Sequence, residues 1–95
     1  MVQRPIASPL RRLERIIKGF ANHRRLEILN LLLREPELSV DDIAERLHLG
    51  YENASDHVRK LAIAGLVMKR SDGPHVRHKL TARANDVLAL CKKLE

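Results

Sequence analysis

The polar and charged side chains best suited to specific binding are concentrated between residues 51 and 60. Asn53 has the donor and acceptor pattern that pairs with the edge of adenine, and the guanidinium of Arg59 could bind guanine or a phosphate. We expect both groups to face outward from one helix, together with neighbouring polar side chains. The residues expected to contact a nucleic acid from this helix are Tyr51, Glu52, Asn53, Ser55, Asp56, Arg59 and Lys60.

Two of these side chains, Glu52 and Asp56, are acids on a surface that would meet a polyanion. Acids in the first turns of a helix are stabilised by the positive end of the helix dipole. Asp56 is also spaced to pair with Arg59 or Lys60 at i+3 and i+4, or its carboxylate could accept a hydrogen bond from cytosine. The first two explanations are structural and are favoured, although neither removes the local repulsion from DNA.

A second basic group surrounds Asp72 and Gly73, a pair that strongly favours a hairpin turn. Residues 66–70 and 76–80 are typical of short strands, with the turn at 71–74 between them. A basic hairpin that follows a recognition helix is a wing, which contacts phosphates and positions the protein on DNA. The residues expected to do this are Lys69, Arg70, His75, Arg77 and Lys79, with help from His78.

Other chemistries find no support in the sequence. A zinc site needs three or four convergent ligands, whereas the histidines are scattered, and His75 and His78 should point to opposite faces of a strand. We therefore expect no metal and no cofactor. The sequence contains no glycine-rich phosphate loop and no nucleophile beside a base, so we expect no catalytic residue and no enzyme.

Cys91 is interpreted as a small buried hydrophobe; the alternative is a thiol near a dimer axis that forms an intersubunit disulfide.

The element that must position residues 51–60 is a pair of short helices between Ser39 and Gly65. Ser39 suits an N-cap, and Asp42 completes a capping box with it. Gly50 is expected to let the backbone turn between the helices, with Leu49 pointing inward, and Gly65 is expected to end the second helix. This second helix has an apolar inner face, made by Ala54, Val58, Leu61 and Ala62. Such a pair is a helix-turn-helix, whose second helix can enter a major groove.

Further helices are expected at residues 10–20, 22–34 and 81–95. The middle one is apolar on several sides, which is typical of a central core helix. The apolar stripes of the outer two are expected either to pack together within one chain or to form a dimer. The expected interface consists of Leu13, Ile16, Ile17, Phe20, Val87, Leu88, Cys91 and Leu94. The predicted fold class is therefore mainly α, a winged helix-turn-helix of five helices with a two-stranded β-hairpin wing.

Length and composition limit the partners of this protein. A chain of 95 residues is expected to be a single domain, with residues 1–9 as a mobile arm. The net charge of +6 favours nucleic acid or an anionic membrane surface. The aromatic residues, Phe20 and Tyr51, are too few to stack on single strands. No apolar run could span a bilayer, so no membrane partner is expected, and the single cysteine favours the cytoplasm.

Over residues 17–80 the sequence resembles the ArsR-like winged helix-turn-helix regulators. The resemblance is carried by KGFANHRRLEILNLLL, ELSVDDIAERLHLG and DHVRKLAIAGLVMKRSDG, leading into VRHKL. It implies a homodimeric DNA-binding regulator of transcription, usually a repressor, with a dimer interface built from the first and last helices. Metal-sensing members carry two cysteines where this chain has Ser39 and Asp41. Other members place paired histidine and acidic metal ligands on the last helix, which contains no histidine in this chain. The resemblance therefore leaves the effector unidentified.

The sequence predicts a transcriptional repressor that binds double-stranded DNA sequence-specifically. A homodimer would place its recognition helices in successive major grooves, so the operator should be an inverted repeat. The competing hypothesis is a winged-helix module for protein–protein contact, in which Glu52 and Asp56 form part of the contact surface.

Overall fold

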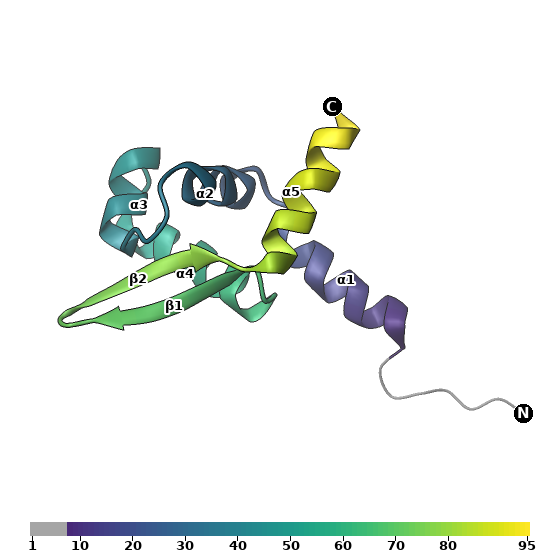
Figure 1. Cartoon of the computed structure of the whole chain (residues 1–95), viewed down its shortest axis with the longest axis horizontal. Helices are drawn as coiled ribbons and strands as arrows, with labels where there is room; N and C mark the ends of the chain where they lie inside the picture. Colours follow the sequence, from purple (N-terminus) through teal and green to yellow (C-terminus); the bar gives the residue numbers. More distant parts are fainter. Residues whose placement is uncertain (1–7) are drawn as a thin grey trace, which may run out of the picture.

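The structure is a computed structural model that describes residues 8–95; most of the expected mobile arm falls on residues 1–7, outside the described part. Within it, helices and a two-stranded antiparallel sheet follow one another along the chain (Figure 1). The elements are α1 (Pro9–Phe20), α2 (His23–Arg34), α3 (Val40–Leu47), α4 (Tyr51–Ile63), β1 (Val67–Asp72), β2 (His75–Leu80) and α5 (Ala82–Leu94). The predicted winged helix-turn-helix fold is confirmed.

Helices α1, α2, α3 and α5 begin at a polar side chain that caps them, and Ser39 at α3 is the cap that the sequence indicated. At α3, the Ser39 hydroxyl accepts a hydrogen bond from the backbone N–H of Asp42, and the Asp42 carboxylate accepts one from the backbone N–H of Ser39, both at 3.1 Å. The hydrogen bond from the Ser39 backbone N–H holds the pKa of Asp42 below its ordinary value, because it stabilises the charged carboxylate. The other side-chain caps are made by Ser8 at α1, Asn22 at α2 and Thr81 at α5.

The turn between α3 and α4 depends on His48, and the prediction that Gly50 makes it is wrong. His48 has a left-handed backbone (φ 56°, ψ 46°), whereas Gly50 has a φ of −65° that any residue can adopt. The backbone N–H of Leu49 donates to the carbonyl of Ala44 at 2.9 Å, and the Leu49 side chain packs against the core as predicted. We infer that this packing offsets the cost of a left-handed residue that is not glycine.

Helix α2 is the centre of the hydrophobic core, as predicted. Ile28, Leu29, Leu31 and Leu32 are each at most 2% exposed, and α3, α4, α5 and β2 all pack against this helix. Leu33 is the exception, at 57% exposure. Burial of one leucine or isoleucine side chain contributes about 1.5–3 kcal/mol, so α2 is a main source of stability. In residues 8–95, no helix has the length and apolar character needed to cross a bilayer.

The hairpin extends farther toward its turn than predicted. Asp72 pairs with His75, which leaves Gly73 and Pro74 as the turn, and Gly73 has a φ of 62°. A positive φ at the first turn residue suits the right-handed twist of a tight hairpin. The predicted wing is therefore present, with a shorter turn and longer strands.

His78 is buried, so the expectation that it helps to contact phosphate is wrong. Its side chain is 1% exposed, and its Nδ1 lies 2.9 Å from the carbonyl oxygen of Leu38. The backbone N–H of His78 also donates to this oxygen, through a bridge between β2 and the loop before α3. Burial lowers the pKa of His78, because a charged imidazole would lose its hydration.

Acid is expected to destabilise the fold through two histidines. The fold lowers the pKa of both His57 and His78, in each case chiefly by burial, and the nearby Arg25 cation lowers the pKa of His57 further. The unfolded chain therefore binds protons near the ordinary pKa of 6.5 that the folded chain does not bind. The free energy of unfolding should fall as the pH drops below about 6.5, by at most about 1.4 kcal/mol per pH unit for each group.

Urea unfolding at pH 7 and at pH 5.5 measures this loss. We expect a smaller loss in His57→Gln, and the wild-type loss in the control His75→Gln, because His75 is exposed. Equal stability of the wild type at the two pH values would contradict the expectation.

Helix α1 joins the rest of the fold near its C-terminal end. Gly19 lies so close to α4 that a Cβ atom there would be 2.5 Å from the Cβ of Ala64. Arg25 fastens the same end, because its guanidinium donates to the carbonyls of Lys18 and Gly19, each at 3.3 Å. The Nε of Arg25 donates to Nδ1 of His57 on α4 at 3.1 Å. No residue of α1 is buried, and the helix extends away from the body of the protein (Figure 1).

Candidate nucleic-acid interface

Helix α4 has one buried side and one polar side. Ala54, Val58 and Leu61 are at most 1% exposed and form the buried side. Among the predicted contact residues, Ser55 and Asp56 are half-buried, and the exposed ones are Tyr51, Glu52, Asn53, Arg59 and Lys60. Because α4 begins at Tyr51, Asn53 lies in its first turn, the part of a recognition helix that reaches base edges.

The acid Asp56 is held by two cations of its own helix. Lys60 Nζ lies 3.2 Å from one carboxylate oxygen, and Arg59 hydrogen-bonds the other. The hydrogen bond from Lys60, followed by the one from Arg59, lowers the pKa of Asp56. The structure thus contains the i+3 and i+4 pairing that the spacing indicated. Because Asp56 neutralises part of the charge of Arg59 and Lys60, these two cations attract DNA less than they would without it.

The wing distributes its cations over both faces of the hairpin. Arg70 and Arg77 are opposite one another in the register, so their side chains share a face, and Lys79 lies on this face as well. Lys69 is opposite His78 and lies on the other face. All of these cations except the half-buried Arg77 are exposed, as is His75 next to the turn.

Two of the wing cations are already paired with acids. Arg70 donates from Nε to the Glu37 carboxylate at 3.0 Å, and Arg77 donates from Nε to Asp72 at 3.2 Å. Lys69 and Lys79 have no ion-pair partner within residues 8–95. These two lysines are therefore the wing cations most available to a phosphate.

Glu37 is a residue of this surface that the sequence did not indicate. Its backbone has a φ of 71°, and its N–H donates to the carbonyl of His78 at 2.8 Å. This hydrogen bond places the carboxylate beside Arg70 on the wing. A glutamate in a left-handed conformation has no sequence signal, because the bridge to β2 that holds it is long-range.

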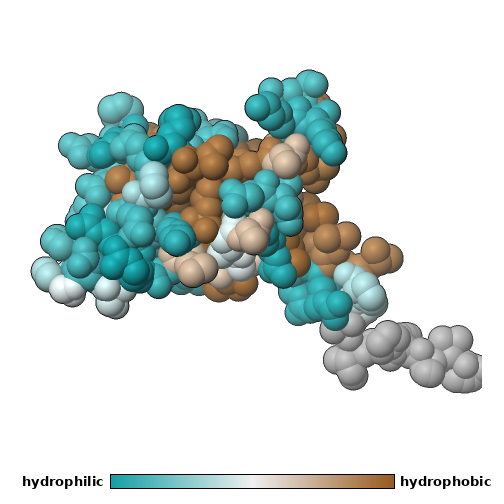
Figure 2. All heavy atoms as spheres, viewed as in Figure 1, coloured by the Kyte–Doolittle hydropathy of each residue, from teal (hydrophilic) through white to brown (hydrophobic). Residues whose placement is uncertain are grey.

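The exposed apolar side chains of α1 and α5 form a second surface. On α1, Leu10 is 75% exposed, Leu13 49% and Ile17 42%; on α5, Leu90 is 50% exposed and Leu94 75%. Apolar atoms are visible over α1 and the base of α5, on the side away from the wing (Figure 2). The two helices diverge rather than packing along each other (Figure 1), so the alternative of stripes paired within one chain is not what the structure shows.

The structure changes the membership of the expected dimer interface. Val87 is 8% exposed and lies in the core of the protomer, so little of its side chain is available to a partner. Phe20, Leu88 and Cys91 pack partly against the same core. Ile16 is half-buried and lines a cavity beside α4 instead of the exposed stripe.

No cluster of three or more His, Cys, Asp or Glu residues that could hold a metal ion occurs in residues 8–95. The absence of a native metal or cofactor stays a prediction. Cys91 is a half-buried free cysteine against the core, an environment consistent with a small hydrophobe.

A polar recognition helix on a buried base, with a basic hairpin beside it, defines a DNA-binding class of fold. Residues 22–68, from the start of α2 into β1, match the family model for winged helix-turn-helix DNA-binding domains. The chain belongs to this family, which is a class of DNA-binding domains and not of enzymes.

Particular relatives are regulators of transcription. The transcriptional activator HlyU of Vibrio cholerae is 39% identical over 67 residues, covering 70% of this chain and 61% of that protein. The chain thus spans less than two thirds of the curated relative that it matches. The structure of HlyU from the same species aligns with a TM-score of 0.75 at 33% identity, covering 87% of this chain and 90% of that one. A homodimeric winged helix-turn-helix domain from Mycobacterium bovis, a possible ArsR-family regulator, aligns with a TM-score of 0.83 at 28% identity, covering 99% and 89%.

Proposed function

We propose that this protein is an ArsR-like regulator that binds double-stranded DNA as a homodimer, with α4 of each subunit in the major groove of an inverted repeat. The observation that carries the proposal is the α4 face, on which exposed polar side chains are held by a completely buried opposite side. In this arrangement Asn53 pairs with adenine and Arg59 with guanine or phosphate. These contacts supply the choice of sequence.

The wing supplies affinity that does not depend on sequence. Its cations are Lys69, Arg70, His75, Arg77 and Lys79. Neutralising a phosphate releases condensed counterions, so each contact strengthens binding at low salt. Lys69 and Lys79 contribute most, because Arg70 and Arg77 must first leave their acidic partners.

Dimerisation is supported by the apolar side chains that α1 and α5 leave in solvent. Leu10 and Leu94 are each 75% exposed, which is unfavourable for a small domain unless another surface covers them. The Mycobacterium bovis relative is a homodimer. A symmetric pair of recognition helices would read half-sites about 34 Å apart.

Repression is the direction of regulation that we propose. A dimer that occupies an operator blocks other proteins by occupancy alone and needs no further contact. The curated relative is an activator; a reporter gene placed behind the selected operator decides between the two directions.

The rival function, contact with another protein, is favoured by Glu52, an exposed acid on the α4 face. Asp56 supports the rival less, because Lys60 and Arg59 already pair with it. A protein-contact module would bind random DNA only weakly and would enrich no sequence.

A salt titration of the wing tests the DNA function. We expect Lys79→Gln to weaken binding to specific and random DNA alike and to flatten the plot of log affinity against log salt by up to about one unit. The matched control is Lys93→Gln, because Lys93 is in the last turn of α5, and the C-terminal end of this helix lies away from the wing (Figure 1). Equal slopes for the two variants would argue against a wing that contacts phosphate.

A further inference from the structure

A cavity of about 530 Å³ lies between the C-terminal half of α1 and the C-terminal half of α4. Ligand pockets in proteins typically measure about 300–1,000 Å³, so this cavity has room for a small organic molecule. It lies at the junction where Gly19 meets Ala64. Two of the expected site residues line this cavity: Lys60, which also belongs to the polar face of α4, and Ile16, which was expected in the dimer interface.

The lining of this cavity is strongly cationic. Six of its ten residues are lysines or arginines and none is an acid, and these cations come from α1, α2, α4 and α5. They are Arg12, Arg15, Lys18, Arg25, Lys60 and Arg83. Cations gathered around a hollow with low-dielectric walls concentrate a positive potential inside it, which attracts anions.

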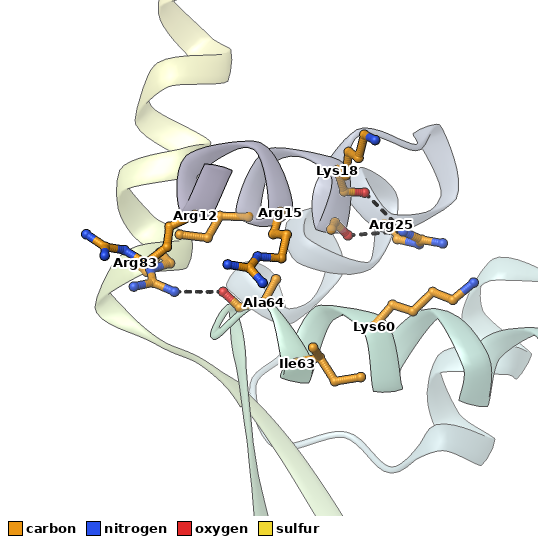
Figure 3. A pocket seen from close by; sticks show the side chains of 10 residues that line it. Arg12, Arg15, Lys18, Arg25, Lys60, Ile63, Ala64 and Arg83 are labelled. Carbon is orange, nitrogen blue, oxygen red and sulfur yellow. Dashed lines mark hydrogen bonds between the residues drawn. The ribbon is translucent and has the colours of Figure 1, made fainter. Parts of the chain in front are cut away.

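The arginines of the cavity differ in whether their guanidinium groups already donate hydrogen bonds to the protein. Arg83 donates to the carbonyl of Ala64 at 2.8 Å, and Arg25 donates to the carbonyls of Lys18 and Gly19 (Figure 3). The side chain of Arg15 extends from α1 toward Ala64, and that of Arg12 extends toward Arg83 (Figure 3); neither has a hydrogen-bond or ion-pair partner among residues 8–95. Two arginines are thus held in place by backbone carbonyls, and two keep all their donors for a ligand.

The remaining lining is apolar and small. Ile16 comes from α1 and Ile63 from α4, with Gly19 and Ala64 at the contact between the helices. An inorganic anion would leave these side chains without a partner. An anion with an apolar body would use both the arginines and the isoleucines.

We propose that this cavity binds a small organic anion that joins a carboxylate to an apolar body. Arg15 and Arg12 bind the carboxylate as a charge-assisted pair, and Ile16 and Ile63 contact the apolar part. A second copy of the chain is a less suitable occupant, because the exposed stripe of Leu10, Leu13 and Ile17 does not line the cavity.

Such a ligand would connect α1 to the C-terminal end of α4, next to Lys60 and its partner Asp56. An effect on DNA binding rests on the function proposed above, whereas binding of the anion itself does not. The test is therefore made without DNA.

The probe is 2-naphthoate, titrated into the full ¹⁵N-labelled chain at pH 7 and followed by the amide resonances. We expect saturable shifts at Ile16, Gly19 and Ile63, and binding about tenfold weaker in Arg15→Ala, since one charge-assisted contact is lost. The matched control Arg11→Ala removes an exposed arginine of α1 that does not line the cavity, and it should bind as the wild type does. Ile63→Glu, at a position 75% exposed, should abolish binding by placing an acid beside the arginines.

Two reference ligands separate the contribution of the anionic group from that of the apolar body. Neutral 2-naphthalenemethanol has only the apolar body, and inorganic sulfate has only the negative charge. Each should therefore bind at least about tenfold more weakly than 2-naphthoate. The proposal is overturned if the alcohol or sulfate binds equally well, or if the shifts fall on Leu10, Leu13 and Ile17. It is also overturned if 2-naphthoate does not bind; a flatter salt dependence of DNA binding in Arg15→Ala would then assign these cations to DNA phosphate.

Discussion

Leu13→Asp is expected to convert the protein from a dimer into a monomer and to weaken operator binding on the order of 100-fold, because two half-sites are then no longer bound together. Leu13 is 49% exposed in the protomer, so the substitution leaves the core intact. In a dimer it would bury an unpaired carboxylate against apolar side chains, which is costly. Sedimentation equilibrium at micromolar concentration measures the mass directly.

The matched control for this experiment is Val76→Asp. Val76 is an apolar residue with a similar exposed fraction, 45%, but it lies on the wing. The Val76→Asp variant should sediment with the same dimer mass as the wild type. A wild-type protein that sediments as a monomer would contradict the predicted dimer. Leu88 is a less suitable position, because it packs partly against the protomer's own core and its substitution would disturb folding.

Asn53→Ala is expected to cost about 1–3 kcal/mol of binding free energy on the preferred operator and to relax the choice at one base pair per half-site. Asn53 is exposed in the first turn of α4, so the change removes an amide without opening a cavity. Binding to random DNA should stay as it was, because no phosphate contact is lost. Titrations with the operator and with a scrambled sequence, under one salt condition, give both values.

Asp56→Ala distinguishes a carboxylate that only pairs with Arg59 and Lys60 from one that accepts a hydrogen bond from cytosine. Since Lys60 and Arg59 pair with Asp56 in the structure, its removal frees two cations, and we expect binding to all DNA to tighten a few-fold, about the effect of one further phosphate contact. A carboxylate that accepts from cytosine would instead give weaker operator binding with stronger random binding. If neither Asn53→Ala nor Asp56→Ala changes any DNA affinity while circular dichroism shows intact folding, α4 contacts a protein and the rival function stands.

Local signals in this sequence predicted local structure well. The capping box of Ser39 and Asp42 and the pairing of Asp56 with its i+3 and i+4 neighbours are both formed over a few residues. The buried positions of α4 followed from helical spacing, because Ala54 and Val58 are separated by one turn. Such features depend on backbone geometry that is the same in every helix.

Features that depend on distant parts of the chain were missed. His78 is buried by a bridge to Leu38 that spans 40 residues of sequence. One signal could have indicated it: Leu80, two residues along the same strand, shares its face and packs on the core. The left-handed backbone of His48 was also missed, because the sequence pattern assigned the turn to the nearby Gly50.

The cationic cavity could not be predicted either. Its arginines lie between positions 12 and 83, and long-range contacts bring α1 beside α4: the close approach of Gly19 to Ala64 and the hydrogen bonds of Arg25. In the sequence, Arg12 and Arg15 are indistinguishable from Arg11, which is a solvent-exposed cation of the same helix. The dimer interface stays a prediction; of the residues assigned to it, Val87 lies in the protomer core, because helical spacing does not distinguish a core face from an interface.

Selection of bound sequences from a pool of random double-stranded DNA tests most directly whether α4 reads DNA. We expect enrichment of an inverted repeat whose half-sites are centred about one helical turn apart, roughly 34 Å, and loss of one base preference per half-site when the selection is repeated with Asn53→Ala. A pool that remains random after repeated rounds, with a wild-type protein that is folded and dimeric, would contradict this expectation.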